Sequence, residues 1–123
     1  NVKRIGYVAS EITKNGGIAV CAPIAPYKKD REYNRRLISK LGGYIEIHIS
    51  TPLEKCEERD VKGLYKLARE GKLKEFTGIS DPYEDPTNAE LVIDSSEIEP
   101  EKLVDKIYNY IEERGFISKW IND

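Results

Sequence analysis

Amphipathic helical patterns alternate with short apolar runs along this chain, and that alternation limits the fold more than any other feature of the sequence. Residues 18–21 read Ile-Ala-Val-Cys, with no polar residue among them. Such continuity is typical of a parallel strand buried on both faces, so a strand is predicted over residues 17–25. A helix is predicted over residues 2–14, because four apolar residues recur there with helical spacing: Ile5, Val8, Ala9 and Ile12.

The remaining segments continue the alternation. Strands are predicted over residues 44–49 and 91–93. Further helices are predicted over residues 28–41, 52–59, 63–68 and 100–115. Thr51, with Pro52 next and Glu54 three residues later, predicts a capping box at the start of the second of these helices. This order of elements predicts an α/β layered domain with a mostly parallel sheet, which binds ligands beyond the carboxyl ends of its strands.

Length and composition exclude several classes of protein. The 123 residues suffice for one domain, and the net charge of −2 argues against a nucleic-acid-binding coat. We find no apolar run long enough to span a bilayer and no signal-peptide pattern, and therefore expect a cytoplasmic protein with no membrane partner. Cys21 and Cys56 are expected to be reduced thiols, and a single histidine, His48, makes a histidine metal cluster or a Ser-His-Asp triad improbable.

Residues 59–83 differ from their surroundings. They contain three glycines, an excess of lysine and arginine, and one isolated aromatic residue, Phe76. Glycines permit hinge motions, cations pair with phosphate, and an aromatic face stacks on a base, so the segment fits a lid over a phosphorylated, base-containing ligand. The alternative is a solvated, charged connection with no ligand, because charge runs are commonly plain surface.

Four collinear stretches resemble the adenylyl-sulfate kinase family of P-loop kinases. They are NVKRIG at residues 1–6, PYKKDR at 26–31, RDVKGLYK at 59–66, and FTGI with PYE between 76 and 84. The pair RDVKGLYK and FTGI is the specific part. The resemblance implies transfer of the γ-phosphate of ATP to the 3′-hydroxyl of adenylyl sulfate, which gives 3′-phosphoadenylyl sulfate for sulfate assimilation. It implies Mg²⁺ with the ATP, and we expect a homo-oligomer, a dimer. Whether this protein is fused to or associated with an ATP sulfurylase stays open.

The resemblance also implies a three-layer P-loop-kinase-like fold with a lid at about residues 60–85. The chain contains no GxxxxGK[ST] loop and begins at Asn1, in the middle of a family motif. Residues 1–123 are therefore expected to be the carboxyl-terminal part of the domain. The first strand, the P-loop lysine and the acidic base are expected upstream, so no catalytic residue and no metal ligand is assigned within this chain.

Binding roles follow at matching positions. The resemblance implies substrate contacts by five residues: Asn1, Ile24, Ala25, Lys62 and Phe76. It implies contacts to the adenine of ATP by Arg59 and Ile98. Ala25 stands where many members carry a serine, so a phosphoenzyme at this position is impossible, and direct in-line transfer remains.

Two other functions stay open at this stage. The chain could be a degenerate, non-catalytic nucleotide-binding or regulatory module fused to an ATP sulfurylase. It could also be part of another P-loop kinase of nucleotides or metabolites, although RDVKGLYK with FTGI argues against that.

Overall fold

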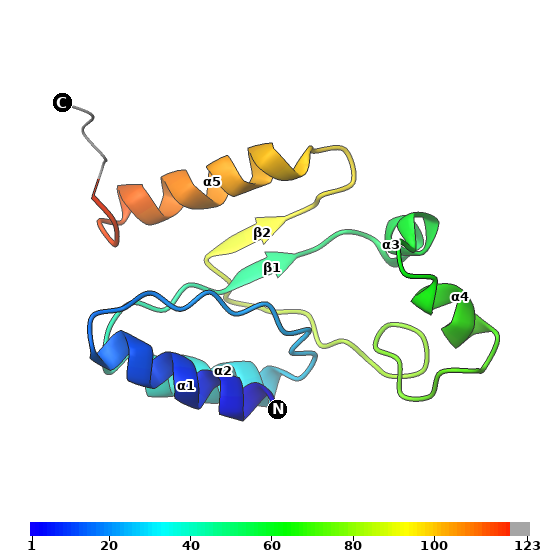
Figure 1. Ribbon diagram of the computed structural model, residues 1–123, viewed down its shortest axis with the longest axis horizontal. Coiled ribbons are helices and arrows are strands. Elements are labelled where there is room, and N and C mark those ends of the chain that lie inside the picture. The colour runs from blue at the N-terminus through cyan, green and yellow to red at the C-terminus, as the bar shows by residue number, and fades with distance from the viewer. Residues whose placement is uncertain (119–123) are drawn as a thin grey trace.

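The computed structural model describes residues 1–118 (Figure 1). In this range, five helices and two strands follow one another: α1 Val2–Lys14, α2 Lys28–Ile38, β1 Ile47–Ile49, α3 Leu53–Arg59, α4 Leu64–Arg69, β2 Leu91–Ile93 and α5 Pro100–Glu113. The predicted helices and two of the three predicted strands are confirmed, with ends that shift by a few residues. The strand expected over residues 44–49 is regular only from Ile47.

Strands β1 and β2 pair in parallel, with Ile47 opposite Leu91 and Ile49 opposite Ile93. In Figure 1 the two strands lie between the α1–α2 pair and α5. Ile93, at the carboxyl end of β2, is only 1% exposed. The predicted α/β class and parallel pairing are confirmed.

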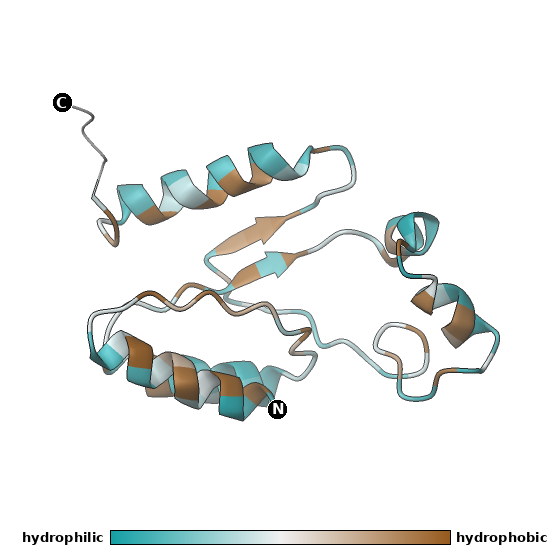
Figure 2. Cartoon of the chain, in the orientation of Figure 1, coloured by the Kyte–Doolittle hydropathy of each residue, from teal (hydrophilic) through white to brown (hydrophobic). Residues whose placement is uncertain are grey.

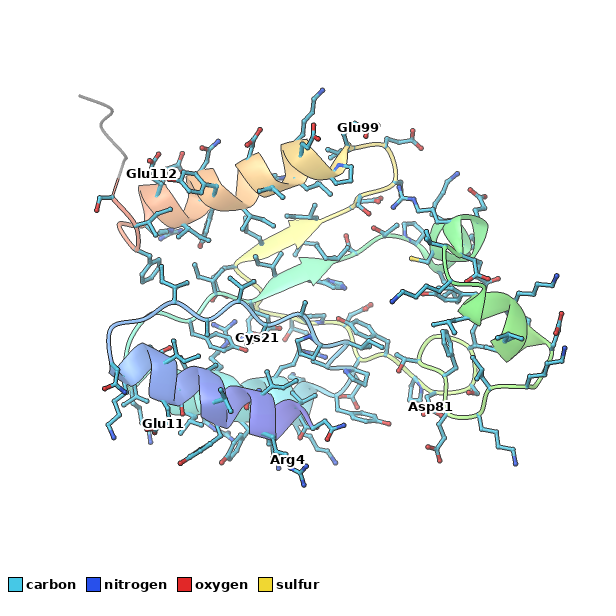
Figure 3. The ribbon with its side chains drawn as sticks, viewed as in Figure 1. Arg4, Glu11, Cys21, Asp81, Glu99 and Glu112 are labelled. Carbon is cyan, nitrogen blue, oxygen red and sulfur yellow. The ribbon has the colours of Figure 1, made fainter. Side chains whose placement is uncertain are left out.

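The strand predicted over residues 17–25 is wrong. This segment follows α1 as irregular chain, and Val20, in its centre, is 93% exposed. A cavity of about 220 Å³, lined by Ala19 and Cys21 on one side and by Ile45 and Ile47 on the other, separates it from β1. Figure 3 shows Cys21 between α1 and the sheet. Ladder hydrogen bonds need a strand about 4.8 Å away, and no strand of the described residues lies beside this segment.

Helices α1 and α2 pack against each other through small and polar side chains. The apolar stripe of α1, visible in Figure 2, buries Ala9, and α2 contributes Ile38. Between them, Gly6 lies so close to the buried Asn34 that a Cβ there would stand 2.0 Å from Asn34 Oδ1. The Asn34 amide donates to the carbonyl of Val2 at 3.1 Å, which restrains its rotation. Any larger residue at position 6 would therefore displace the Asn34 amide from this position.

We predict that Gly6→Ala destabilises the full-length protein by about 1–3 kcal/mol, because the new methyl group overpacks the α1–α2 contact. Thermal and denaturant unfolding would measure the loss. In an Asn34→Ala background the same change should cost much less, because its obstacle is gone. Equal losses in both backgrounds would contradict the packing explanation.

Candidate functional site

The segment after α3 turns back on itself through a side-chain cap. Asp60 ends α3, and its carboxylate accepts hydrogen bonds from the backbone N–H groups of Tyr65 and Lys66, each at 3.0 Å. Gly63 enables the turn with φ +66°, a conformation that disfavours other residues. Lys62 lies in this turn with an exposed side chain. The cap fixes the direction of α4, and α4 sets the position of the loop that follows.

The loop from residue 70 to residue 85 folds around Phe76. The carbonyl of Phe76 accepts hydrogen bonds from the backbone N–H groups of Ile79, Ser80 and Asp81, at 2.9–3.1 Å. The Phe76 ring meets the ring of Tyr65, on α4, edge to face, with centroids 5.2 Å apart. An edge-to-face pair contributes about 0.5–1.5 kcal/mol beyond burial. The predicted lid is therefore a folded unit that holds Phe76 in one place.

A cavity of about 520 Å³ lies between this loop and the carboxyl end of β1, and we call it the lid cavity. Figure 1 shows the lid elements beyond that end of the sheet, where ligands of parallel sheets bind. Its lining residues come from β1, α3, α4, the loop before α2 and the lid loop: Ile24, His48, Ile49, Ser50, Thr51, Pro52, Leu53, Cys56, Tyr65, Glu75, Phe76, Thr77, Gly78, Tyr83 and Asp85. Apolar walls with a few polar groups suit a small organic ligand.

The structure brings together some of the predicted substrate residues and separates others. Phe76 and Ile24 both line the lid cavity. Ala25 lines the 220 Å³ cavity below it instead. Lys62 and Asn1 line neither cavity. The site predicted from the sequence is thus only partly assembled within residues 1–118.

The two residues predicted to contact ATP share a second cavity of about 470 Å³, the Arg59 cleft, which lies after β2. Arg59 and Ile98 line it together with Ser95, Ser96, Glu97, Glu99, Pro100 and Leu103. The Arg59 guanidinium donates to the carbonyls of Ser95 and Ser96, so it anchors the end of α3 to this loop. Arg59 therefore has a structural role here whatever ligand the cleft binds.

The capping box predicted at Thr51 is wrong. Thr51 Oγ1 accepts a hydrogen bond from the backbone N–H of Ser95 at 3.0 Å and lies 2.7 Å from Ser95 Oγ. Helix α3 begins after Pro52 with no side-chain cap. The hydroxyl therefore links the start of α3 to the loop after β2, a partner 44 residues away that a local motif cannot reveal.

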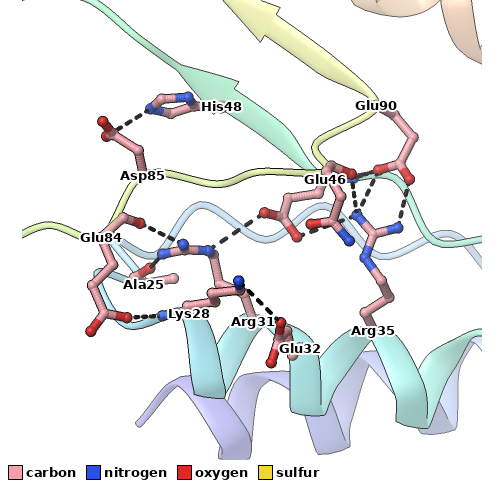
Figure 4. Close-up of polar contacts among 11 residues, drawn as sticks. Ala25, Lys28, Arg31, Glu32, Arg35, Glu46, His48, Glu84, Asp85 and Glu90 are labelled. Carbon is pink, nitrogen blue, oxygen red and sulfur yellow. Dashed lines mark hydrogen bonds and ion pairs between the residues drawn. The ribbon is translucent and has the colours of Figure 1, made fainter.

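Three aromatic residues of the lid cavity were not predicted as site residues. His48 and Tyr83 stack with ring centroids 5.8 Å apart, and the Nε2 atom of His48 lies 3.9 Å from Asp85 Oδ1 (Figure 4). Tyr65, on α4, and Tyr83, on the segment that returns from the lid loop, line the same cavity. Burial raises the pKa of both phenols, so both remain protonated hydrogen-bond donors at neutral pH. A signal for His48 was its place near the carboxyl end of a predicted strand.

Two arginines on α2 pair with two carboxylates at the start of the sheet (Figure 4). Arg35 forms a bidentate pair with Glu90, and both Arg31 and Arg35 lie within 3.5 Å of the Glu46 carboxylate. Burial opposes ionisation of Glu90, but the hydrogen bond from Arg35 and the Glu46 backbone N–H outweigh it, so the pKa of Glu90 is lowered. The lowered pKa keeps Glu90 charged at neutral pH, and the ion pairs connect α2 to the residues that directly precede both strands.

No group of three or more His, Cys, Asp or Glu side chains within residues 1–118 is placed to hold a metal ion. Each helix in the same stretch is too short or too polar to cross a membrane.

Comparisons with known proteins identify the family. The family model described as adenylylsulphate kinase matches residues 1–94. The chain belongs to the adenylylsulphate kinase family. An adenylyl-sulfate kinase of Halothermothrix orenii is 44% identical over 118 residues, which are 96% of this chain and 62% of that protein. The resemblance found in RDVKGLYK and FTGI is thereby confirmed.

Two other relatives place the family match in context. The APS kinase of Mycobacterium tuberculosis, solved in complex with AMPPNP and APS, superposes with a TM-score of 0.84 at 30% identity, over 90% of this chain and 64% of that chain. A sulfate adenylyltransferase of Aspergillus terreus is 44% identical over 97% of this chain but only 21% of its own length. The chain thus spans less than two thirds of the kinases and about a fifth of the adenylyltransferase, and its P-loop-kinase fold is confirmed.

Glu75 leads to a prediction about the lid loop. It lines the lid cavity in the left-handed backbone region, with φ +55°. Relief of this conformation, worth about 1–2 kcal/mol, should exceed the entropic cost of glycine, about 0.5–1 kcal/mol. Glu75→Gly should therefore raise the melting temperature. Glu70→Gly, at an ordinary φ of −75°, is the matched control and should lower it. A lower melting temperature for Glu75→Gly would contradict this account.

Proposed function

We propose that the protein containing this chain phosphorylates the 3′-hydroxyl of adenylyl sulfate with ATP, in sulfate activation. The observation that carries this proposal is the pair of cavities on either side of α3. Leu53 and Cys56 of α3 line the lid cavity, and Arg59, at the end of the same helix, lines the Arg59 cleft. Two nucleotides that react with each other need two adjacent sites, and the family membership supports adenylyl sulfate in one and ATP in the other.

The adenine of adenylyl sulfate is proposed to stack on Phe76 in the lid cavity. The Phe76 ring already packs edge to face against Tyr65 in the absence of ligand. Ligand binding should therefore cost little further side-chain entropy at Phe76. Ile24, across the cavity, would contact the other side of the ligand. The Mycobacterium tuberculosis kinase was solved with APS and AMPPNP bound, which supports the same two classes of ligand here.

Lys62, Asn1 and Ala25 lie outside the lid cavity in this arrangement. Lys62, on an exposed turn, is proposed to reach an anionic part of adenylyl sulfate when the lid closes, since lids complete a site on binding. Ala25 and Asn1 are proposed to contact the substrate from the loop before α2 and from the start of α1. Ala25 has no hydroxyl, so the phosphoryl group passes directly between the two nucleotides.

We infer that residues 1–123 are the carboxyl-terminal part of the kinase domain, with the lid at about residues 60–85. The P-loop lysine and the acidic base belong to the rest of the domain. Mg²⁺ would arrive on the phosphates of ATP, where it neutralises charge. In this chain, Arg59 and Ile98 would hold the adenine of ATP in the Arg59 cleft. A cytoplasmic location and a dimer remain predictions.

Transfer of labelled γ-phosphate from ATP to adenylyl sulfate by the purified full-length protein tests the proposal. Labelled 3′-phosphoadenylyl sulfate is the expected product, and adenylyl sulfate should compete for the acceptor site where a nucleoside monophosphate does not. Transfer to a nucleoside monophosphate instead would establish another P-loop kinase and overturn the proposal.

We predict that Phe76→Ala raises the KM for adenylyl sulfate far more than the KM for ATP. Loss of one stacked base costs about 1–3 kcal/mol, or roughly five-fold to more than one-hundred-fold. Steady-state kinetics with each substrate varied in turn would measure the two constants. Phe76→Tyr retains the ring and is the matched control, which should stay near the wild-type value. An unchanged KM for adenylyl sulfate in Phe76→Ala would refute the stacking role.

A second prediction concerns Lys62. Lys62→Ala should weaken adenylyl sulfate binding through loss of a charge-assisted contact, worth about 1.5–3 kcal/mol. Lys66→Ala, one helical turn further along the same exposed segment, removes an equal charge at a position without a proposed ligand role. Calorimetric titration of both variants with adenylyl sulfate would measure the difference. If Lys62→Ala and Lys66→Ala bind adenylyl sulfate with the same affinity, Lys62 acts only through net charge.

A second candidate function is a non-catalytic nucleotide-binding or regulatory module within an ATP sulfurylase. The specific observation in its favour is that a relative named sulfate adenylyltransferase matches 97% of this chain in only 21% of its length. Binding of adenylyl sulfate without phosphate transfer, in a full-length protein that makes adenylyl sulfate from ATP and sulfate, would favour this module over the kinase.

A further inference from the structure

One guanidinium group joins three parts of the chain that are far apart in sequence. Arg31, on α2, is only 6% exposed. Its Nη1 atom donates to the carbonyl of Ala25 at 2.7 Å, and its Nη2 atom donates to the carbonyl of Glu84. Its Nε atom lies 3.5 Å from the carboxylate of Glu46 (Figure 4). Arg31 therefore connects the loop before α2, the segment that returns from the lid and the start of β1.

Both carbonyls belong to residues next to a wall of the lid cavity. Ala25 follows Ile24, and Glu84 follows Tyr83, and Ile24 and Tyr83 both line the cavity. The guanidinium also lies over the ring of Tyr83, 5.7 Å from its centroid. The Arg31 side chain thus helps to set the distance between these two walls, because its planar fork can hold two carbonyls at once.

Further hydrogen bonds join the segment that returns from the lid to the loop before α2. The backbone N–H of Glu84 donates to the carbonyl of Pro26 at 2.9 Å, and its carboxylate accepts from the N–H of Lys28, the first residue of α2, at 2.6 Å. Ala25 adopts φ +45°, a strained conformation that persists only where its surroundings enforce it. The hydrogen bond from Arg31 to the Ala25 carbonyl is such a constraint. The return segment of the lid is therefore fastened to the loop before α2.

We propose that Arg31 is a positioning residue that sets the width of the lid cavity by holding Ile24 and Tyr83 at a fixed separation. The inference rests on the proposed function, because it assigns the cavity to adenylyl sulfate. Arg31 itself does not line the lid cavity and acts through the two backbone carbonyls.

Arg35 provides a matched control. It lies one turn further along α2 and shares the Glu46 carboxylate with Arg31. Its other partners, Glu90 and the carbonyl of Asn88, lie away from the lid cavity. Loss of Arg35 should therefore destabilise the fold without changing the separation of Ile24 and Tyr83.

Arg31→Gln and Arg35→Gln in the full-length protein test the proposal. We expect Arg31→Gln to raise the KM for adenylyl sulfate by about ten-fold or more and to leave the KM for ATP within about two-fold, because small displacements of a binding wall have large kinetic effects. Arg35→Gln should lower the melting temperature but should not raise the KM for adenylyl sulfate relative to the KM for ATP. Unchanged constants in Arg31→Gln, or the same pattern in both variants, would overturn the proposal.

If Arg31→Gln does not fold, Arg31→Lys provides a second test of the positioning role. Lysine keeps the charge but cannot hold both carbonyls, so it should raise the KM for adenylyl sulfate selectively. A wild-type KM in Arg31→Lys would show that charge alone suffices, and would overturn the positioning role.

Amide hydrogen exchange separates failure of this inference from failure of the proposed function. Without Arg31 the N–H groups of Glu84 and Lys28 should exchange faster, whereas Arg35→Gln should leave them close to wild type. This readout needs no substrate. Absence of phosphate transfer by the wild-type protein would refute the proposed function alone, and unchanged exchange in Arg31→Gln would refute the inference alone.

Discussion

The arrangement of this chain depends on the pairing of two guanidinium groups, one buried and one half-buried, with carboxylates where α2 meets the sheet. Glu46 and Glu90 directly precede β1 and β2, and the N–H of Glu46 donates to the Glu90 carboxylate at 2.7 Å. Arg31 and Arg35 neutralise both carboxylates from one face of α2. An uncompensated buried charge costs about 3–5 kcal/mol. The register of the two strands and the position of α2 are therefore determined together.

The lid is stabilised by a different kind of interaction, because it has almost no apolar core of its own. Its helices and turns are held by individual polar contacts: the Asp60 cap on α4, the turn around the Phe76 carbonyl and the ties of Glu84 to the loop before α2. Such contacts open locally at low free energy.

Local sequence patterns correctly predicted those helices and strands whose formation depends on neighbouring residues. The apolar stripe of α1, the proline at the start of α5 and the run Leu91–Ile93 each act within a few residues, and each element forms as expected. The patterns failed where the outcome depends on distant partners. Residues 18–21 have the composition of a buried strand, but a strand also needs a neighbour for its backbone, and the described residues provide none. Thr51 has the spacing of a cap but bonds Ser95 instead.

The sequence alone determined the family, the helix order and the candidate residues Phe76, Arg59 and Ile98, because motifs and periodicity are properties of neighbouring residues. Only the tertiary structure decided which of these residues share a cavity. It placed Phe76 and Ile24 on the lid cavity, left Lys62 outside it and brought Arg31 against carbonyls six and 53 residues away. Such contacts follow from how α2 packs against the sheet and the lid, and pairings over so long a separation leave no periodic trace in one sequence.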